Sequence, residues 1–197
     1  EKPDVGTFMR EWLSLYDSKS GERGIYNGLA SKHHVNDLNT RNRDKNGTYI
    51  QRRVVRDDFG TNPCSEIILR SREFCNLSEV VIRHNDTIES LRDKVRIATI
   101  LGTFQSTLTN FKYLSKEWQR NCEEERLLGV SLTGIMDSPL TNGSKDTNKL
   151  LNELREVAVK TNIEYAEKLG IERSASITCV KPSGTVSQLV DSSSGIH

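Results

Sequence analysis

The sequence predicts an α/β fold in which helices and short strands alternate. Apolar residues recur at helical spacing in residues 3–18 and 146–169. Short runs rich in Val, Ile and Leu lie between helical segments, at 73–82, 127–133 and 176–180. This alternation favours layers of helices and strands over a helical bundle or a β-sandwich. The chain holds no internal repeat, low-complexity tract or linker, so we expect a single structural unit.

The first element is a helix over residues 3–18, which the segment SGERG at 20–24 ends. One stripe of this helix is apolar and consists of Phe8, Trp12, Leu15 and Tyr16. Residues 28–60 are polar, and we predict a long loop or hairpin region with a turn at Asn46-Gly47. Within it, the basic residues Arg52, Arg53 and Arg56 stand beside Asp57 and Asp58, so we expect a solvated loop.

The middle of the chain predicts two short strands and a helix. Residues 64–69 and 73–82 are typical of β segments. Asp86 is the predicted N-cap of the helix, because Glu89 follows three residues later in a capping-box pattern. The residues of this helix that we expect to face the core are Leu91, Val95, Ala98 and Leu101.

The last third of the chain predicts a strand, a long helix and another strand. Residues 127–133, within the run RLLGVSLT, indicate a strand. A helix follows at 146–169, and Gly170 is its predicted stop. Its inward residues are Leu150, Leu154, Val157, Ala158 and Ala166. The run SITCV at 176–180 predicts a strand that leads into KPSGTVSQLV.

Composition excludes several functional classes. The 28 Lys and Arg residues nearly balance the 27 Asp and Glu residues, so nothing indicates binding to nucleic acid or to an acidic membrane. No apolar run approaches the length of a transmembrane helix, and the first residues lack the apolar core of a signal peptide. Four cysteines are too few for a secreted disulfide scaffold, which predicts a reducing, cytoplasmic environment. The chain starts without Met and stops at SSSGIH, so we expect a fragment of a longer protein.

The segment at 61–81 contains two cysteines, Cys64 and Cys75. Asn62, Cys64 and Glu66 occupy alternate positions at its start. In extended chain these three side chains would share one face. A neighbouring carboxylate raises the pKa of a thiol, which suits a thiol that stays protonated and leaves the carboxylate for acid/base work. The alternative is that Cys64 is an ordinary buried small residue and Glu66 a surface charge.

Cys75 follows Cys64 by eleven residues. This spacing is poor for a metal site, and His33 and His34 are remote in sequence, so no metal site is predicted. Cys75 could take part in reversible disulfide chemistry with another thiol, or it could be a buried structural residue. The remaining cysteines, Cys122 and Cys179, are expected to be structural.

The segment KPSGTVSQL at 181–189 joins a predicted strand to a predicted helix. Gly184 permits close backbone approach, and Ser183 and Thr185 add hydroxyl groups. Free N–H groups at a helix start attract phosphate, which makes this turn a candidate phosphate site. It lacks the GK[ST] pattern of a Walker loop, and the alternative is an ordinary turn with Ser as N-cap.

Together these segments resemble ribonucleotide reductases. DFGTNPCSEIIL followed by EFCNLSEVV is similar to their active-site finger, in particular that of the monomeric, adenosylcobalamin-dependent class II triphosphate reductases. The matching positions are Asn62, Pro63, Cys64, Glu66 and Cys75, and Ser65 replaces the usual Gly. The segments SGERGIYN, RLLGVSLTGIMDSP and KPSGTVSQLVDSSSGIH also resemble family segments, so the likeness covers nearly the whole chain.

The resemblance implies a role for each candidate residue. Cys64 would become the thiyl radical that removes the 3′-hydrogen of the substrate ribose, and Glu66 would act as base on the 3′-hydroxyl. Asn62 would hydrogen-bond the ribose. Cys75 would be one of two thiols that reduce the substrate and end as a redox-active disulfide. Ser183, Gly184 and Thr185 would bind the substrate phosphates.

The resemblance also implies a fold and partners. Residues 1–197 would be a fragment of the ten-stranded α/β barrel, with the finger at about 60–80 and the phosphate-binding turn at about 181–188. The complete enzyme would use adenosylcobalamin, ribonucleoside triphosphates and a thioredoxin-type reductant to make DNA precursors. The second reducing thiol would precede residue 1, the tail cysteines would follow residue 197, and the site for deoxynucleotide effectors would lie outside this chain. The isolated chain would therefore be inactive.

Two other functions remain open on sequence. A class I large subunit, which takes its radical from a separate metal-bearing subunit, would carry the same finger. A non-catalytic nucleotide-binding module would keep the phosphate turn alone. The joint presence of Asn62, Cys64, Glu66 and Cys75 argues against the second of these.

Overall fold

Two parallel strands organise the structure, a computed structural model that describes residues 3–20, 24–41 and 52–195. They are β3 (Asn76–Val81) and β4 (Leu128–Thr133), which pair along their whole length. Helices α3 (Ile88–Gln105) and α4 (Lys116–Glu125) lie between these strands in the sequence. A parallel pair requires such a crossover. The predicted α/β class is therefore confirmed, and so are the strands predicted within 73–82 and 127–133.

A third extended segment runs beside β4, where a strand was predicted at 176–180. It forms only an isolated parallel bridge, Val130↔Thr178, rather than a regular strand. Three backbone hydrogen bonds join it to β4: Leu128 N to Ser176 O, Val130 N to Ile177 O, and Cys179 N to Val130 O. The segment thus follows the edge of the sheet without completing a ladder.

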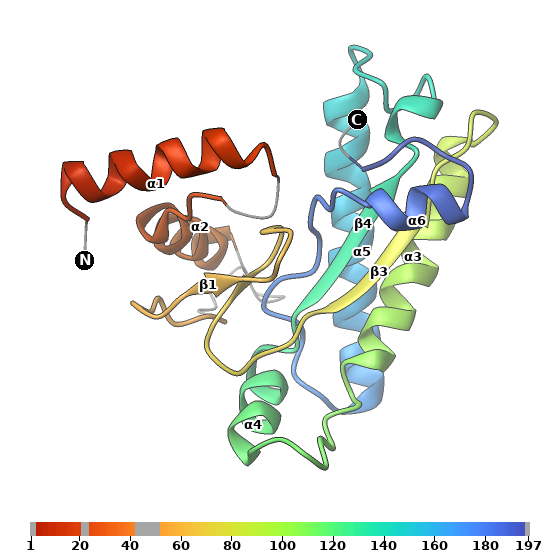
Figure 1. Ribbon diagram of the computed structural model, residues 1–197. Helices are drawn as coiled ribbons and strands as arrows, with labels where there is room; N and C mark the ends of the chain where they lie inside the picture. The colour runs from red at the N-terminus through yellow and green to blue at the C-terminus, as the bar shows by residue number, and fades with distance from the viewer. Residues whose placement is uncertain (1–2, 21–23, 42–51, 196–197) are drawn as a thin grey trace.

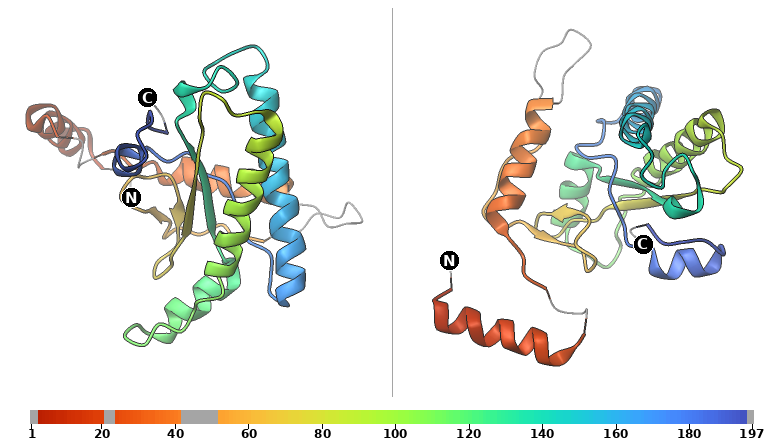
Figure 2. Two further views of the ribbon diagram at one scale, coloured as in Figure 1. Left: turned by 90° about the vertical axis from the view of Figure 1, so that its right-hand side faces the viewer. Right: turned by 90° about the horizontal axis from the view of Figure 1, so that it is seen from above.

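Helices cover one face of the β3–β4 pair. Figure 2 shows α3 and α5 (Thr147–Leu169) side by side on this face. Between helices and strands lies the main apolar core, which consists of Val80, Ile82, Leu91, Val95, Ala98, Val130, Leu150, Leu154 and Ala158. As predicted, α5 ends at Gly170, whose φ of 64° is the left-handed conformation that glycine adopts most easily.

The start of α3 differs from the prediction. Its N-cap is Thr87, and the capping box is completed by Ser90 rather than by Glu89. Asp86 instead accepts hydrogen bonds from the Arg83 amide and the Lys94 ammonium. Leu101, predicted to face the core, is 62% exposed. It belongs to an outward stripe of apolar residues: Ile97, Leu101, Phe104 and Leu108.

The region predicted to be a loop at 28–60 begins with a helix, α2 (Gly28–Arg41). The Asn27 side chain accepts a hydrogen bond from the Ala30 amide, which is the bond that an N-cap residue makes. Val35 is the one described apolar residue of α2 that is buried. This helix therefore shows little of the apolar periodicity on which the sequence prediction depended. The turn predicted at Asn46-Gly47 lies outside the described residues.

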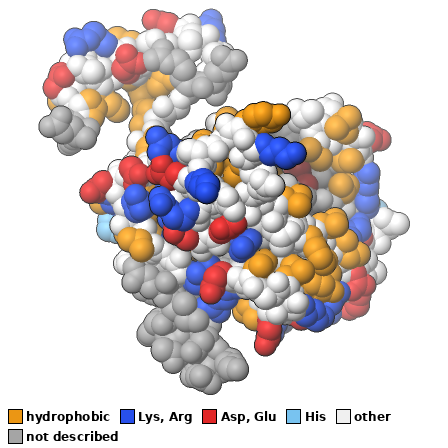
Figure 3. Space-filling view, turned by 90° about the horizontal axis from the view of Figure 1, so that it is seen from below, with side chains coloured by type: hydrophobic (Ala, Val, Ile, Leu, Met, Phe, Trp, Pro, Cys, Tyr) orange, Lys and Arg blue, Asp and Glu red, His pale blue; other side chains and the backbone are white. Residues whose placement is uncertain are grey.

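The predicted first helix is present as α1 (Val5–Ser18), and the Asp4 carboxylate caps its first turn. No residue of α1 is buried, so its apolar stripe does not join the core. Figure 1 shows α1 lying apart from the β3–β4 pair. Viewed from below, apolar side chains gather on one part of the surface and charged side chains on another (Figure 3). None of the described helices is both long and apolar enough to cross a membrane.

A buried ion cluster joins the segment before β1 (Gly60–Thr61) to the rest of the molecule, where a solvated loop was predicted. The Arg53 guanidinium is 2.6 Å from a Glu125 carboxylate oxygen and 3.4 Å from one of Glu73. Arg70 lies 3.4 Å from Glu73 and 2.8 Å from Glu124. Arg53 also donates to the Ile68 carbonyl. Burial of these charges is possible because each guanidinium meets carboxylates.

The buried pair predicts a large effect of Arg53→Met on stability. The substitution removes the guanidinium that lies 2.6 Å from the buried Glu125 carboxylate, so we expect the unfolding free energy to fall by about 3–5 kcal/mol. Urea unfolding followed by circular dichroism measures this. Arg56→Met is the matched control, because its pair with Asp58 is at the surface. Equal stability of the two variants would contradict the assigned role of the cluster.

Glu73 predicts a pH dependence of stability. Burial raises the pKa of Glu73 from its ordinary 4.5 to about 8, with the Glu125 charge adding to the effect and Arg53 opposing it. Between these values the folded chain binds more protons than the unfolded chain, so stability falls as pH rises, by at most about 1.4 kcal/mol per pH unit. Urea unfolding from pH 5 to 8 should show this fall in the wild type and in the control Glu117→Gln. An equally steep fall in Glu73→Gln would rule out Glu73 as its source.

Candidate active site

The predicted finger is a short hairpin. Strands β1 and β2 (Ile68–Leu69) pair antiparallel, with Gly60 opposite Leu69 and Thr61 opposite Ile68. Residues 62–67 form the connecting turn, closed by a hydrogen bond of 2.9 Å from the Ser65 amide to the Asn62 carbonyl. The finger therefore presents its central residues on a tight turn.

The prediction that Asn62, Cys64 and Glu66 share one face of an extended strand is wrong. Pro63 and Cys64 lie in the turn, and Ser65 has a φ of 61°, which breaks the alternation of faces. Cys64 is exposed. Both carboxylate oxygens of Glu66 are buried, with no hydrogen-bond partner among the described residues.

Asn62 holds the turn together. Its side-chain oxygen accepts a hydrogen bond of 3.0 Å from the backbone N–H of Ile67. The backbone N–H of Asn62 donates in turn to the Ile67 carbonyl at 3.3 Å. No hydrogen bond from its side-chain nitrogen is found among the described residues, so this group is available to a ligand. The positive φ at Ser65 explains why glycine suits this position, since a side chain is strained there.

The finger rests on the face of the sheet opposite to α3 and α5, which we call the open face. On this face lie Cys75, Leu77 and Glu79 of the β3 segment, Gly129 and Ser131 of β4, and Cys179. A Cβ atom at Gly129 would be 2.5 Å from Leu77 Cδ2, 3.1 Å from Cys179 Sγ and 3.2 Å from Ile67 Cδ1. A side chain at Gly129 would therefore crowd the place where the finger, β3 and the Cys179 segment meet.

Two half-buried thiols, Cys75 and Cys179, belong to the apolar cluster under the finger. Burial raises the pKa of Cys75 most, and the charges of Cys179 and Glu66 raise it further. Burial and the Glu66 charge raise the pKa of Cys179 to about 12. Both sulfurs therefore carry their protons at neutral pH, which suits hydrogen-atom transfer rather than attack by a thiolate.

Cys179 is not a direct disulfide partner for Cys75. Strand β4 lies between the two segments, and two strand spacings amount to about 9.6 Å. A disulfide needs Cα atoms within about 7 Å. Cys179 still lies on the open face beside the finger. No flanking residue in the sequence predicted this position.

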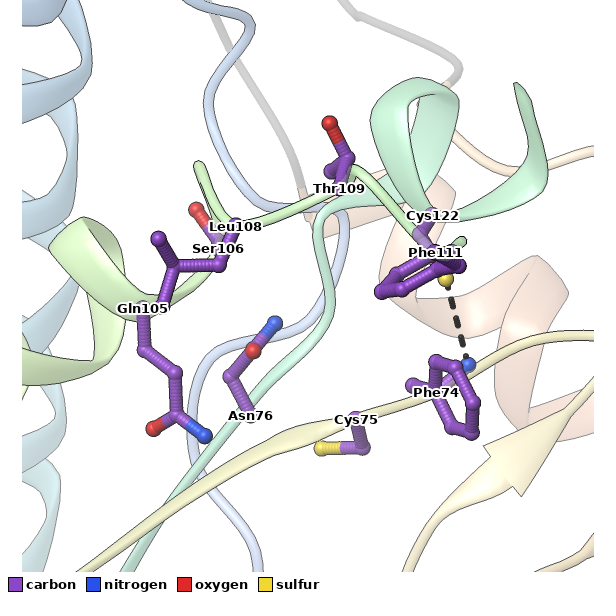
Figure 4. Close-up of a pocket in the computed structure, with 9 residues that line it drawn as sticks. All are labelled: Phe74, Cys75, Asn76, Gln105, Ser106, Leu108, Thr109, Phe111 and Cys122. Atoms are coloured by element: carbon purple, nitrogen blue, oxygen red, sulfur yellow. Dashed lines mark hydrogen bonds between the residues drawn. The ribbon is translucent and has the colours of Figure 1, made fainter. Parts of the chain in front are cut away.

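The last cysteine, Cys122, lies elsewhere. Its sulfur accepts a hydrogen bond of 3.3 Å from the Phe74 amide, and the Cys75 sulfur is turned away from it (Figure 4). Both residues border a cavity of about 300 Å³ whose other lining residues include Asn76, Gln105 and Phe111. No group of three or more His, Cys, Asp or Glu side chains that could hold a metal ion occurs in the described part of the chain.

The predicted phosphate turn precedes a short helix, α6 (Gly184–Leu189). Ser183 is buried with a φ of 58° and makes no side-chain cap hydrogen bond, whereas Gly184 and Thr185 are exposed. Figure 2 shows α6 on the opposite side of the sheet from α3 and α5, which is the side of the finger. The chain then returns to the end of β4, where the Gly134 amide donates to the Ser193 carbonyl at 2.8 Å.

Comparison with known proteins supports the likeness seen in the sequence. No family model matches the chain. The adenosylcobalamin-dependent ribonucleoside-triphosphate reductase of Lactobacillus delbrueckii subsp. bulgaricus is 31% identical over 169 residues, which is 72% of this chain and 22% of that protein. The protein of the same name from Lacticaseibacillus paracasei is 28% identical over 94% of this chain and 27% of its own length.

A solved structure agrees with these relatives. The crystal structure of a B-12 dependent (class II) ribonucleotide reductase matches with a TM-score of 0.57 and 28% identity, over 71% of this chain and 23% of that one. The resemblance to class II ribonucleotide reductases is confirmed. The chain spans about a fifth to a quarter of the length of these reductases.

Gly129→Ala tests how the finger is seated. The added methyl group overlaps Leu77, whose branch end must move, and crowds Ile67 of the finger. We expect a loss of about 1–3 kcal/mol in unfolding free energy and faster proteolytic cleavage of the finger. Gly60→Ala is the matched control within the finger, because a Cβ atom there meets nothing within 4 Å. If both variants match the wild type in both measurements, the close contact at Gly129 does not hold the finger.

Proposed function

We propose that this chain is part of an adenosylcobalamin-dependent ribonucleoside-triphosphate reductase. The observation that carries the proposal is the position of the finger: its turn exposes Cys64 and rests on the open face that holds Cys75. The identity to reductases of this name supports it. The residues would form one fragment of the ten-stranded α/β barrel, in which the open face is the inner wall.

In this function Cys64 gives up the hydrogen atom of its S–H bond, and the resulting thiyl radical removes the 3′-hydrogen of the ribose. Glu66 accepts the proton of the 3′-hydroxyl, and its unpartnered oxygens are suited to this. Asn62 donates to the ribose through its side-chain nitrogen. The hydrogen atom returns from Cys64 to the ribose once the substrate is reduced.

The reducing electrons come from two thiols. Cys75 and a second thiol outside the described residues become a disulfide, while the 2′-hydroxyl leaves as water and a hydrogen takes its place. Two S–H bonds are oxidised and one C–O bond is reduced, so atoms and electrons balance. A thioredoxin-type reductant would restore the thiols. The raised pKa of Cys75 fits a thiol that must keep its proton until the substrate is bound.

The substrate triphosphate would lie at the turn of Ser183, Gly184 and Thr185. Gly184 leaves space, since a Cβ atom there would meet nothing within 4 Å. No side chain caps the first turn of α6, so its amides are available to phosphate oxygens. The turn is on the same side of the sheet as the finger, and we expect one nucleotide to contact both.

Cys64 is the residue of this chain that adenosylcobalamin would approach, because its thiol is exposed on the outside of the finger. When bound, the cofactor would supply the radical that removes the hydrogen atom from Cys64. Its other contacts, and the site for deoxynucleotide effectors, would belong to parts of the protein beyond this chain. Such an enzyme would be cytoplasmic, because its thiols need a reducing environment.

Cys64→Ser tests the proposal in the complete gene product. Assayed without oxygen with adenosylcobalamin, a dithiol and CTP, the wild type should form deoxynucleotide, and the variant none, because an alcohol O–H does not replace the S–H bond. Cys122→Ala is the control and should keep its activity, since the Cys122 sulfur accepts a hydrogen bond from the Phe74 amide and the Cys75 sulfur is turned away from it. The isolated 197-residue chain should form no product.

Three results would change the proposal. Product formation by Cys64→Ser would contradict the radical role of Cys64. Activity with a metal-radical partner subunit, but not with adenosylcobalamin, would indicate a class I enzyme and leave the finger roles in place. Nucleotide binding without turnover in the complete wild-type protein would indicate a non-catalytic module.

A further inference from the structure

The segment that carries the candidate phosphate turn forms a closed loop, residues 182–195, which we call the turn loop. The Gly195 N–H donates to the Pro182 carbonyl at 3.0 Å, so the chain leaves the sheet and returns to the same point. A Cβ atom at Gly195 would lie 1.9 Å from the Lys181 carbonyl oxygen and 3.1 Å from that of Leu132. A side chain there is therefore excluded unless the backbone moves.

Two residues with a left-handed backbone flank α6 within the turn loop. Ser183 has a φ of 58° and Asp191 a φ of 48°, and neither is glycine. Such a backbone conformation persists where surrounding contacts fix it. The contacts that fix the turn loop therefore also decide where the candidate phosphate-binding residues lie.

Arg83, two residues after the end of β3, holds the turn loop just beyond α6. Its Nη1 donates to the Asp191 carbonyl at 2.7 Å, and its Nη2 donates to the Val190 carbonyl. Both carbonyls follow the last residue of α6, and the carbonyls at a helix end lack partners within the helix. The planar guanidinium can bond two neighbouring acceptors at once, which suits arginine rather than lysine.

Asp137, in the short 3-10 helix after β4 (Ile135–Asp137), holds the turn loop at a second point. Its Oδ2 accepts a hydrogen bond of 2.8 Å from the Ser193 N–H. The Ser193 carbonyl accepts from the Gly134 N–H at 2.8 Å and from the Thr133 hydroxyl at 3.1 Å. Ser193 is thus bonded to the end of β4 through both its N–H and its carbonyl.

We propose that Arg83 and Asp137 are positioning residues for the candidate phosphate turn, because they clamp the turn loop to the carboxyl ends of β3 and β4. The inference rests on the proposed function. The carboxyl ends of parallel strands are where α/β sheets bind their ligands. Neither residue has to touch the nucleotide. Since α6 is only six residues long, fixing its end at residues 190–193 also fixes its start.

The first test does not depend on turnover. In the complete protein, mass spectrometry measures hydrogen–deuterium exchange in peptides that cover residues 184–195. Exchange should become about threefold faster or more in Arg83→Met and in Asp137→Ala, because the loop opens more often once one anchor is gone. Arg120→Met and Asp93→Ala are the matched controls and should exchange like the wild type, since both side chains are exposed, on α4 and α3.

Asp137→Asn separates the hydrogen bond from a general loss of stability. The asparagine side chain keeps an oxygen that can accept from the Ser193 N–H, so exchange of the turn loop should stay close to that of the wild type. Exchange as fast as in Asp137→Ala would show that the bond to Ser193 does not hold the loop.

The second test measures the Kd for CTP by equilibrium dialysis and kcat at saturating CTP. In Arg83→Met and Asp137→Ala the Kd should rise by about five- to tenfold, because only molecules with the turn in place bind the phosphates. The value of kcat should stay within about twofold, since the finger is untouched. A merely structural role would lower stability and kcat and leave the Kd of the folded protein unchanged.

The two tests separate the inference from the proposed function. Unchanged exchange in both Arg83→Met and Asp137→Ala overturns the clamp, even in an active enzyme. Faster exchange with an unchanged Kd for CTP overturns its link to phosphate binding. Weaker CTP binding by the variants, in a protein whose wild type binds CTP but forms no deoxynucleotide, supports the clamp and overturns the proposed reaction instead.

Discussion

The close approach at Gly129 is the contact on which the rest of the site depends. The strand pair offers a flat open face, and a single missing side chain lets Ile67 of the finger reach it beside Leu77 and Cys179. A Cβ atom at this point would force the end of the Leu77 side chain to move and would crowd Ile67 of the finger at 3.2 Å. The positions of Cys64, Asn62 and Glu66 relative to Cys75 are therefore set by the backbone of β4 as much as by the finger itself.

A second set of contacts holds the base of the finger. The ion cluster of Arg53, Arg70, Glu73 and Glu125 ties the segment before β1 and the end of β2 to α4. Charges hold the base of the finger, and apolar contacts hold its underside. Because α3 and α5 cover the other face, the open face is the side of the strand pair left for chemistry. Burial raises the pKa of Cys75 and Cys179 on this face and so keeps both thiols protonated.

Sequence patterns located the elements that bury an apolar stripe. Helices α3 and α5 and strands β3 and β4 were predicted within a few residues, because their core residues recur at the period of a helix or a strand. The same reasoning missed α2, which buries little apolar surface and depends on the cap at Asn27. It also predicted a β segment at 64–69, although Pro63 and the left-handed Ser65 turn the chain there and only Ile68–Leu69 is a strand.

The candidate site was only partly visible in the sequence. Asn62, Cys64, Glu66 and Cys75 stand close together in one segment, and the family resemblance named them. The sequence did not show that four further residues share the face on which the finger rests: Glu79, Gly129, Ser131 and Cys179. Their common face follows from the register of β3 and β4 and from the position of the segment around Thr178 beside β4. No local pattern marks such residues, since their relation depends on strands more than 45 positions apart.

A crystal structure of the complete protein with a bound ribonucleoside triphosphate tests the central claim most directly. The account predicts that the ribose lies between the finger turn and the open face, in contact with Asn62, Cys64 and Glu66, with its phosphates at the turn of Ser183 to Thr185. A nucleotide bound elsewhere, or a Cys64 side chain turned away from the ribose, would contradict it.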